Sequence, residues 1–276
     1  MRSTIRSVGL ALALAIPAAA HADESTLCTD ITSAPYSITA PGIYCLKNSV
    51  TGDISIQADD VVLDLNGHVI EPLKPGLGSG VWATDRANIT VRNGTIRGFH
   101  YGIQFAGSKG SRNHLLEHLK ITDSLDSAII LYGDGSVVRR NMLLNNGFDT
   151  GPGARFVLYA QGTGIHIADN QIVESGIGVT VNEVVGIRTN GSGIAVERNV
   201  VSNAEIGPHN SRGIIVNGSA TARNSVVGNR IVNMKIGIMN GFGSAGPAVF
   251  MDNTVGGATF GAFFGGVMAG TTNTSF

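Results

Sequence analysis

The sequence has little of what most protein classes rely on for binding charged partners or membranes. Charged residues make up 14% and aromatic residues 6% of the 276 positions, with 19 Lys+Arg against 20 Asp+Glu. Nucleic-acid binding depends on a surplus of basic residues, so this balance predicts no nucleic-acid partner. After residue 22, no run approaches the ~18 uninterrupted apolar residues of a membrane-spanning helix. The sequence therefore predicts no membrane anchor.

The first 22 residues have the composition of a secretory signal peptide. The segment MRSTIRSVGLALALAIPAAAHA holds two arginines, an apolar stretch and a final small-x-small triplet, Ala-His-Ala. Its apolar stretch is too short to span a bilayer. We therefore expect residues 1–22 to be removed and the mature protein to be secreted or periplasmic.

Cysteine is almost absent, with two residues in the whole chain, Cys28 and Cys45. An even number in an exported chain predicts a disulfide. By loop entropy it would contribute roughly 3 kcal/mol to stability. The alternative is a redox or metal-binding pair, although the spacing matches no such motif.

Glycine is plentiful, with 38 residues, and Val, Ile, Asn and Thr are abundant, which favours many short strands over helices. Five segments also align without gaps around an asparagine, and an aliphatic residue follows two positions later. The asparagines are Asn141, Asn170, Asn199, Asn229 and Asn253. A repeat of 24 to 30 residues without a helical stripe predicts one coil of a solenoid per repeat.

The repeat also predicts which residues face inward. Ile165 and Ile167 precede Asn170 at alternate positions, as Ile194 and Val196 precede Asn199, so these aliphatics should form a stacked core. The asparagine amides should donate and accept along the stack, satisfying backbone groups at a sharp turn.

This pattern of Asn, x and an aliphatic residue, followed in several coils by Gly, resembles right-handed parallel β-helix proteins, the pectate-lyase-like superfamily. The resemblance implies a single all-β domain, a right-handed parallel β-helix of about eight coils over residues 54–264. Residues 23–53, tied by the cysteines, would form an N-terminal cap, and residues 265–276 a C-terminal cap or tail. The fold itself specifies no reaction.

Two outward columns differ in character. Charged residues are concentrated at one turn. They form either a solvated face with ion pairs between coils or a basic track that binds an acidic polysaccharide. A second column is mostly apolar and predicts a surface for self-association or for a covering segment. The residues of the apolar column are Gln104, Ile130, Val157, Thr180, Ile215, Met239 and Phe263.

Two long connectors suggest where a site could lie. The connector from Leu143 to Arg155 and that from Val201 to Gly213 are twice as long as the one from Ile172 to Gly178 between them. Stacking then predicts two bulges flanking a notch about 9 to 10 Å wide, enough for one sugar ring. Its walls and floor would supply substrate-binding residues, namely Asp149, Glu174, Glu205 and Asn210.

The second insertion contains Gly-Pro-His-Asn at 207–210, which looks like the Asp-Pro-His-Asp motif of β-helical alginate C5-epimerases. Pro208 and His209 match the motif, but Gly207 and Asn210 replace both aspartates. The resemblance implies proton abstraction beside a uronate carboxylate, with His209 as base and with Arg212 or Arg155 holding the carboxylate. These three residues are the candidate catalytic set.

The sequence thus predicts an exported β-helix protein that binds an acidic polysaccharide; if the protein is an enzyme, the expected chemistry is that of a polysaccharide lyase or a C5-epimerase. The alternative is a non-catalytic structural or glycan-binding surface protein. No cofactor is expected, and calcium is possible only near Asp123 and Asp126, which lie on one turn.

Overall fold

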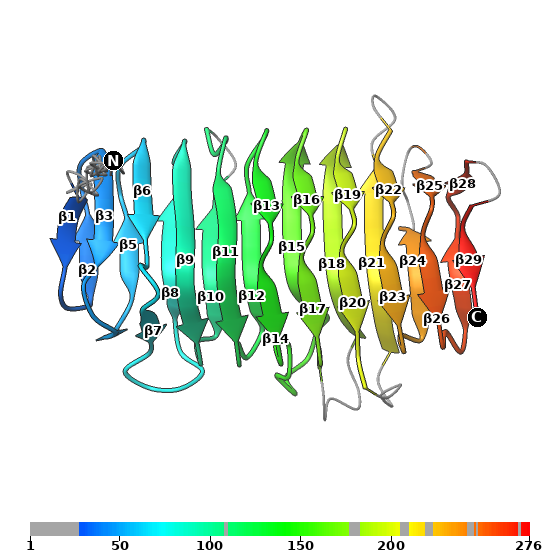
Figure 1. Cartoon of the computed structure of the whole chain (residues 1–276), viewed down its shortest axis with the longest axis horizontal. Helices are drawn as coiled ribbons and strands as arrows, with labels where there is room; N and C mark the ends of the chain where they lie inside the picture. Colours follow the sequence, from blue (N-terminus) through cyan, green and yellow to red (C-terminus); the bar gives the residue numbers. More distant parts are fainter. Residues whose placement is uncertain are drawn as a thin grey trace, which may run out of the picture.

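The computed structural model describes residues 28–107, 110–176, 183–204, 210–218, 223–241, 246, 248–269 and 272–276. Its strands stack into one elongated body along which the chain advances from end to end (Figure 1). All the strand pairs are parallel, for example β10 with β12 and β15 with β18, in two sheets. The predicted right-handed parallel β-helix is confirmed.

The ten-stranded sheet contributes one strand per coil. Its strands are β2 (Tyr36–Ile38), β5 (Ile54–Ile56), β8 (Ser79–Thr84), β10 (Tyr101–Ala106), β12 (Ser127–Tyr132), β15 (Arg155–Thr163), β18 (Glu183–Ser192), β21 (Asn210–Gly218), β24 (Ile236–Asn240) and β27 (Gly261–Phe264). Nine of these lie within residues 54–264, where about eight coils were predicted.

The nineteen-stranded sheet forms the other wall and is bent at the asparagine turn, so most coils contribute two short strands. Its strands are β1 (Cys28–Ile31), β3 (Gly42–Leu46), β4 (Val50–Thr51), β6 (Val61–Asp64), β7 (Val69–Glu71), β9 (Ile89–Arg97), β11 (Leu115–Thr122), β13 (Val137–Arg139), β14 (Met142–Leu144), β16 (His166–Ala168), β17 (Gln171–Val173), β19 (Ala195–Glu197), β20 (Val200–Ser202), β22 (Ser225–Val227), β23 (Arg230–Val232), β25 (Val249–Met251), β26 (Thr254–Gly256), β28 (Val267–Met268) and β29 (Thr274–Ser275).

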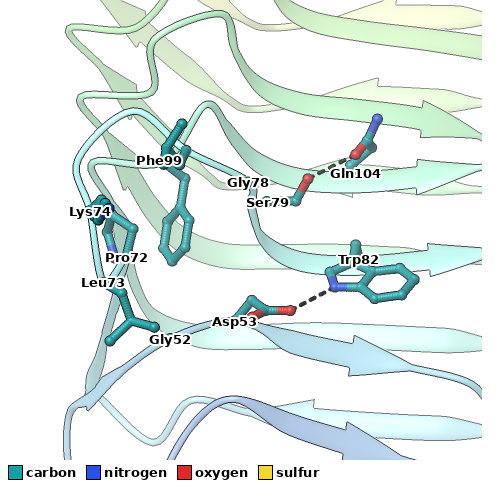
Figure 2. Close-up of a pocket in the computed structure, with 11 residues that line it drawn as sticks. Gly52, Asp53, Pro72, Leu73, Lys74, Gly78, Ser79, Trp82, Phe99 and Gln104 are labelled. Atoms are coloured by element: carbon teal, nitrogen blue, oxygen red, sulfur yellow. Dashed lines mark hydrogen bonds between the residues drawn. The ribbon is translucent and has the colours of Figure 1, made fainter.

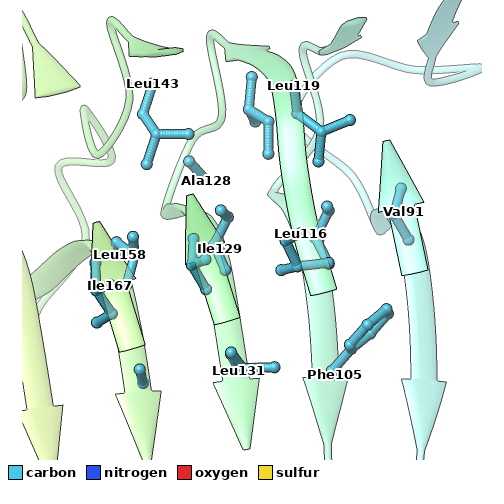
Figure 3. Close-up of a cluster of buried hydrophobic side chains, with 14 of the residues drawn as sticks. Val91, Phe105, Leu116, Leu119, Ala128, Ile129, Leu131, Leu143, Leu158 and Ile167 are labelled. Atoms are coloured by element: carbon cyan, nitrogen blue, oxygen red, sulfur yellow. The ribbon is translucent and has the colours of Figure 1, made fainter. Parts of the chain in front are cut away.

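The core is a set of aliphatic columns between the two sheets, as the repeat predicted. Val91, Leu116 and Ile167 lie on one wall and face Ile129 and Leu158 on the other, and all five are fully buried (Figure 3). Each coil buries a similar set of side chains and contacts mainly its neighbours. The scaffold therefore presents its outward residues in straight columns at about 4.8 Å intervals.

An asparagine ladder holds the turn of the nineteen-stranded sheet together. The backbone N–H and the side-chain amide of Asn141 both donate to Oδ1 of Asn170, each at 3.0 Å. Asn170 repeats these contacts with Asn199, and the ladder continues through Asn229 and Asn253. The predicted role of these asparagines is confirmed. The residue before each one has a positive φ, as at Asp169 (58°), which makes the turn sharp.

The predicted disulfide is present between Cys28 and Cys45, with 5.9 Å between the Cα atoms. It joins β1 to β3, the pair at the N-terminal end of the nineteen-stranded sheet. The segments predicted as caps, 23–53 and 265–276, contribute strands to the same sheets, including β2, β28 and β29. The predicted signal peptide, residues 1–22, lies outside the described residues.

The strand register shows that the predicted notch is wrong. Leu143 pairs with Ile172 and Arg155 pairs with Val184, so the connectors of these two coils have the same length. The tight coil expected between two bulges therefore does not exist. The sequence predicts a strand entry at Gly178, in GIGV, whereas β18 begins eleven residues after Ile172, at Glu183.

The observed strand register also corrects the predicted apolar column. Ile130 pairs with Tyr159, and Tyr159 pairs with Arg188, so this outward column contains a tyrosine and an arginine. Val157 is fully buried, and Phe263 packs against the core. Thr180 lies outside the described residues. An uninterrupted apolar column is therefore absent from the described part of this sheet.

Candidate functional site

The outer face of the ten-stranded sheet carries a row of cavities. Two of them, of about 600 and 630 Å³, share Gln104, and the second shares Ile130 and Tyr132 with a third of about 340 Å³. A fourth, of about 270 Å³, lies further along the same face over β21, β24 and β27. We call this row the sheet groove. Ligand sites are concave, and a row that crosses several coils suits a polymer better than one small molecule.

An aromatic cluster forms the middle of the sheet groove. The ring centroids of Tyr159 and Tyr132 are 5.7 Å apart, and those of Tyr159 and Phe156 are 5.6 Å apart. Phe156 and Tyr159 are three residues apart on β15, yet both line this cavity, because two consecutive buried residues, Val157 and Leu158, interrupt the alternation between them. These three rings line the third cavity together with Asp126 and Arg188. The cluster offers flat apolar faces beside charged groups.

Arg188 supplies the positive charge of this cavity. Its guanidinium carbon lies 4.7 Å from the centre of the Phe156 ring, within the range of a cation–π contact. Its Nε atom is buried and has no hydrogen-bond partner among the described residues. Within the same part of the chain, Arg188 also forms no ion pair. A guanidinium held in this way can bind a carboxylate through two parallel hydrogen bonds.

Tyr159 is fixed as a neutral ring beside Arg188. Its hydroxyl donates to Oε1 of Gln161 at 2.7 Å, which orients the phenol along the sheet. Burial raises the pKa of Tyr159, so the hydroxyl stays protonated at neutral pH. The ring is therefore positioned to stack on a ligand and not to act as a base.

Arg155, predicted to hold a substrate carboxylate, instead organises its own loop. Its Nη2 donates to Oδ2 of Asp149 at 2.7 Å and to the carbonyl of Gly151 at 3.0 Å. Its Nε lies 3.5 Å from Oδ2 of Asp126, and only 6% of the side chain is exposed. The N–H of Gly151 and the guanidinium of Arg155 lower the pKa of Asp149. Both groups are thus occupied by structural contacts.

The other predicted site residues are dispersed. Oε1 of Glu174 accepts the backbone N–H of Ala204, so it supports a turn. Arg212 and Asn210 line the fourth cavity beside Lys235, and Nη1 of Arg212 lies 3.0 Å from Oε1 of Glu183. The predicted base His209 and the predicted contact Glu205 lie outside the described residues.

A serine and a histidine that resemble a catalytic pair prove to be structural. His114 is buried, its Nδ1 accepts the N–H of Ile89 at 3.4 Å, and its Nε2 lies 3.0 Å from Oγ of Ser111. Nε2 therefore carries the proton and donates to Ser111, whose own hydroxyl donates to the carbonyl of Tyr132. Burial lowers the pKa of His114 to about 4. The ring cannot accept a proton from Ser111.

The charged turn of the nineteen-stranded sheet forms ion pairs between coils. Arg92 pairs with Asp64 at 2.8 Å, Arg139 with Glu117 at 2.7 Å, and Arg198 pairs with an acid of the preceding coil, Asp169, at 2.9 Å. These contacts support the interpretation of a solvated face over that of a basic track. Asp123 and Asp126 make side-chain contacts with different partners, Asn145 and Arg155.

Two features are absent from the described residues. No described helix is long and apolar enough to cross a membrane. In the same residues, no group of three or more His, Cys, Asp or Glu side chains is arranged to hold a metal ion.

Comparison with known proteins places the fold in context. The family model described as a right-handed β-helix region matches residues 46–183 and 79–260, and no curated protein sequence matches the chain. XylC in complex with xylose is 14% identical, with a TM-score of 0.50, over 76% of this chain and 38% of that one. The catalytic domain of a GH87 α-1,3-glucanase with nigerose is 12% identical, with a TM-score of 0.42, over 89% and 63%. The chain spans less than two thirds of either, and the likeness concerns the fold alone.

Proposed function

The chain belongs to the right-handed β-helix family, and from this fold and its sheet groove we propose that it binds a carboxylate-bearing polysaccharide. The observation that carries the proposal is the aromatic cluster of Tyr132, Phe156 and Tyr159 beside Arg188. Aromatic faces pack against the apolar faces of sugar rings, and a guanidinium pairs with a carboxylate.

The dimensions of the groove support a polymer as ligand. The first three cavities are contiguous through Gln104, Ile130 and Tyr132 and extend from the coil of Trp82 to that of Arg188. Trp82 and Tyr159 are three coils apart in one column, which corresponds to about 14 Å. A chain of sugars running along the sheet axis would contact several coils at once. XylC, which shares the fold, is solved with xylose, a neutral sugar, and this supports a carbohydrate ligand in general.

Export is part of the proposal. The Cys28–Cys45 disulfide persists in oxidising compartments, which favours a secreted or periplasmic protein. The ligand would then be an extracellular or envelope polysaccharide. Export can be tested by fractionating cells that express the full chain and by determining the N-terminal residue of the purified protein.

Calorimetric titration with polygalacturonate, alginate and a neutral glucan tests the binding function. We expect saturable binding of a polyuronate and binding of the neutral glucan at least about tenfold weaker. Tyr159→Ala should reduce polyuronate affinity about tenfold, whereas Met142→Ala, an exposed residue of β14, should not change it. Equal affinity for the neutral glucan, or full affinity of the Tyr159 variant, would contradict the proposal.

The same incubations report on chemistry. Lyase activity would release unsaturated sugars, which absorb ultraviolet light, and epimerisation would exchange the C5 proton in deuterated water. Either signal would make the protein an enzyme. Its loss in a His209→Gln variant would support the base predicted from the sequence.

A further inference from the structure

The first cavity of the sheet groove differs chemically from the others. It lies between the β7–β8 loop, residues 72–78, and the outer face of β8, and has a volume of about 600 Å³. Figure 2 shows Pro72 and Leu73 of the loop on one side and Trp82 on the other. Leu77 and Phe99 complete the apolar lining. The cavity is therefore a slot with an indole ring opposite aliphatic side chains.

Three large apolar side chains around this slot are exposed to solvent. Leu73 is 73%, Leu77 60% and Trp82 37% exposed. A single exposed apolar residue is ordinary, but three that border one cavity form a patch of the kind that marks a binding site.

Hydrogen bonds fix the slot in its open shape. Nε1 of Trp82 donates to Oδ2 of Asp53 at 2.8 Å, which sets the plane of the indole ring (Figure 2). The N–H of Gly76 donates to the carbonyl of Gly98 at 2.7 Å, and the carbonyl of Gly78 accepts two N–H groups from residues 100 and 101. Prolines at 72 and 75 further restrict the loop. A wall preformed in this way lowers the entropic cost of binding.

At this end of the groove the lining favours an apolar ring over a bare sugar. Leu73 and Leu77 offer no hydrogen-bond partner to the hydroxyl groups of a sugar. A planar apolar ring satisfies both walls, because it can stack on the indole and contact the leucines. Toward the next cavity, the oxygen of Gln104 accepts the hydroxyl of Ser79 at 2.8 Å, which makes that end polar. Asp53, which accepts from Trp82, and Lys74 are the charged residues of the lining.

We propose that this cavity is a binding site for an aryl group, with any attached sugar directed toward Gln104 and the rest of the sheet groove. The aryl group would stack on Trp82 and be covered by Leu73 and Leu77. The cavity is the end of the groove proposed to bind the polysaccharide, but the aryl site uses residues outside the aromatic cluster around Tyr159, so the two assignments can be tested separately.

Tryptophan fluorescence tests the assignment directly, because Trp82 is the only tryptophan of the chain. The matched probes are phenyl β-D-glucopyranoside and methyl β-D-glucopyranoside, which differ only in the apolar group. The phenyl compound should shift or quench the emission saturably, with an affinity at least about tenfold above that of the methyl compound. Equal responses to the two compounds would overturn the proposal.

Substitutions at the cavity test whether the phenyl compound binds there. Leu73→Asp combined with Leu77→Asp changes two exposed positions, so the fold should persist, and we expect at least about a tenfold loss of phenyl glucoside affinity. Val267→Asp, an exposed apolar position on β28, is the control and should bind normally. Tyr159→Ala should also bind the phenyl compound normally, which separates this site from the polysaccharide site. Unchanged affinity in the Leu73/Leu77 variant would overturn the proposal.

Discussion

Asn170 donates both its backbone N–H and its side-chain amide to Oδ1 of Asn199, at 3.0 and 2.9 Å. The side chain of Asn199 in turn donates to the carbonyl of Ile167 at 2.9 Å and to Oδ1 of Asn229 at 3.0 Å. One buried amide therefore satisfies groups in the preceding and the following coil. In a solenoid, where each coil contacts mainly its neighbours, such a residue links local turns into one cooperative unit.

Asn199→Ala should therefore destabilise the protein far more than its size suggests. It removes the acceptor for two donors of Asn170 and the donor to the carbonyl of Ile167, all of them buried. Each unsatisfied group costs about 1 to 3 kcal/mol, so we expect the free energy of unfolding, measured with urea, to fall by about 3 to 5 kcal/mol. The control is Asn190→Ala, an exposed asparagine of β18, with a loss below about 1 kcal/mol. Similar losses in both variants would refute a special role for the ladder.

The disulfide should stabilise one end of the solenoid and not the whole. Cys28 lies on β1, which pairs only with β3 in the described structure, so reduction removes the covalent link of a terminal strand. Loop entropy assigns it about 3 kcal/mol. We expect the variant Cys28→Ser with Cys45→Ser to show faster hydrogen exchange in β1 and unchanged exchange in β15. Faster exchange in both strands would show that the link acts globally.

Acid should destabilise the protein partly through His114. Its pKa is about 4 in the folded chain against 6.5 for a free histidine, so the unfolded chain takes up a proton first as the pH falls. Stability from this group is complete above pH 6.5 and is lost between pH 6.5 and about 4. Between pH 7 and pH 5 the expected loss is about 2 kcal/mol. Urea unfolding measures it.

The matched variant is His114→Gln, which keeps a donor toward Ser111 but has no ring to protonate. Its stability at pH 7 should be lower, because the packing and the bond to Ile89 change. The remaining pH dependence then reports the carboxylates alone. An equal slope in the variant and in the wild type would show that His114 does not titrate in this range.

The fold could be predicted from the sequence because its signals are local and repeated. Asn170 and Ile172 recur in every neighbouring coil at nearly constant spacing, and the residue between them always faces outward. Each coil stabilises the next through the same contacts, so the pattern reappears without gaps. The disulfide was predictable for a simpler reason, since Cys28 had no other partner than Cys45.

The site could not be predicted in the same way because it depends on register across connectors of variable length. Gly178 and Gly186 are both flanked by β-branched residues. The local sequence therefore does not show which of the two glycines aligns with the strands of the neighbouring coils. Pairing with β15 selects Gly186, whose added Cβ would collide with the carbonyl of Gly213. In this register Arg188 pairs with Tyr159 of the preceding coil. Phe156 and Tyr159 are three residues apart on β15, so simple strand alternation would have placed them on opposite faces.

Arg188 and Arg155 should respond differently to the same substitution, and this contrast separates binding from structure. Arg188 has a buried Nε without a partner and a cation–π contact with Phe156, while Arg155 is 5% exposed and contacts Asp126 and Asp149. Arg188→Gln should leave urea stability within about 1 kcal/mol and reduce polyuronate affinity about tenfold. The remaining binding should depend less on salt, because an ion pair has been lost.

Arg155→Gln should do the reverse. Removing one partner of a buried ion pair leaves Asp149 and Asp126 near each other without a cation, at a cost of about 3 kcal/mol or more. Below the unfolding temperature, its affinity for polyuronate should stay within about twofold of the wild type. If the folded Arg155 variant loses binding while the Arg188 variant keeps it, the carboxylate site lies in the 148–155 loop, as the sequence predicted. The aromatic cluster would then be only a packing feature of the sheet surface.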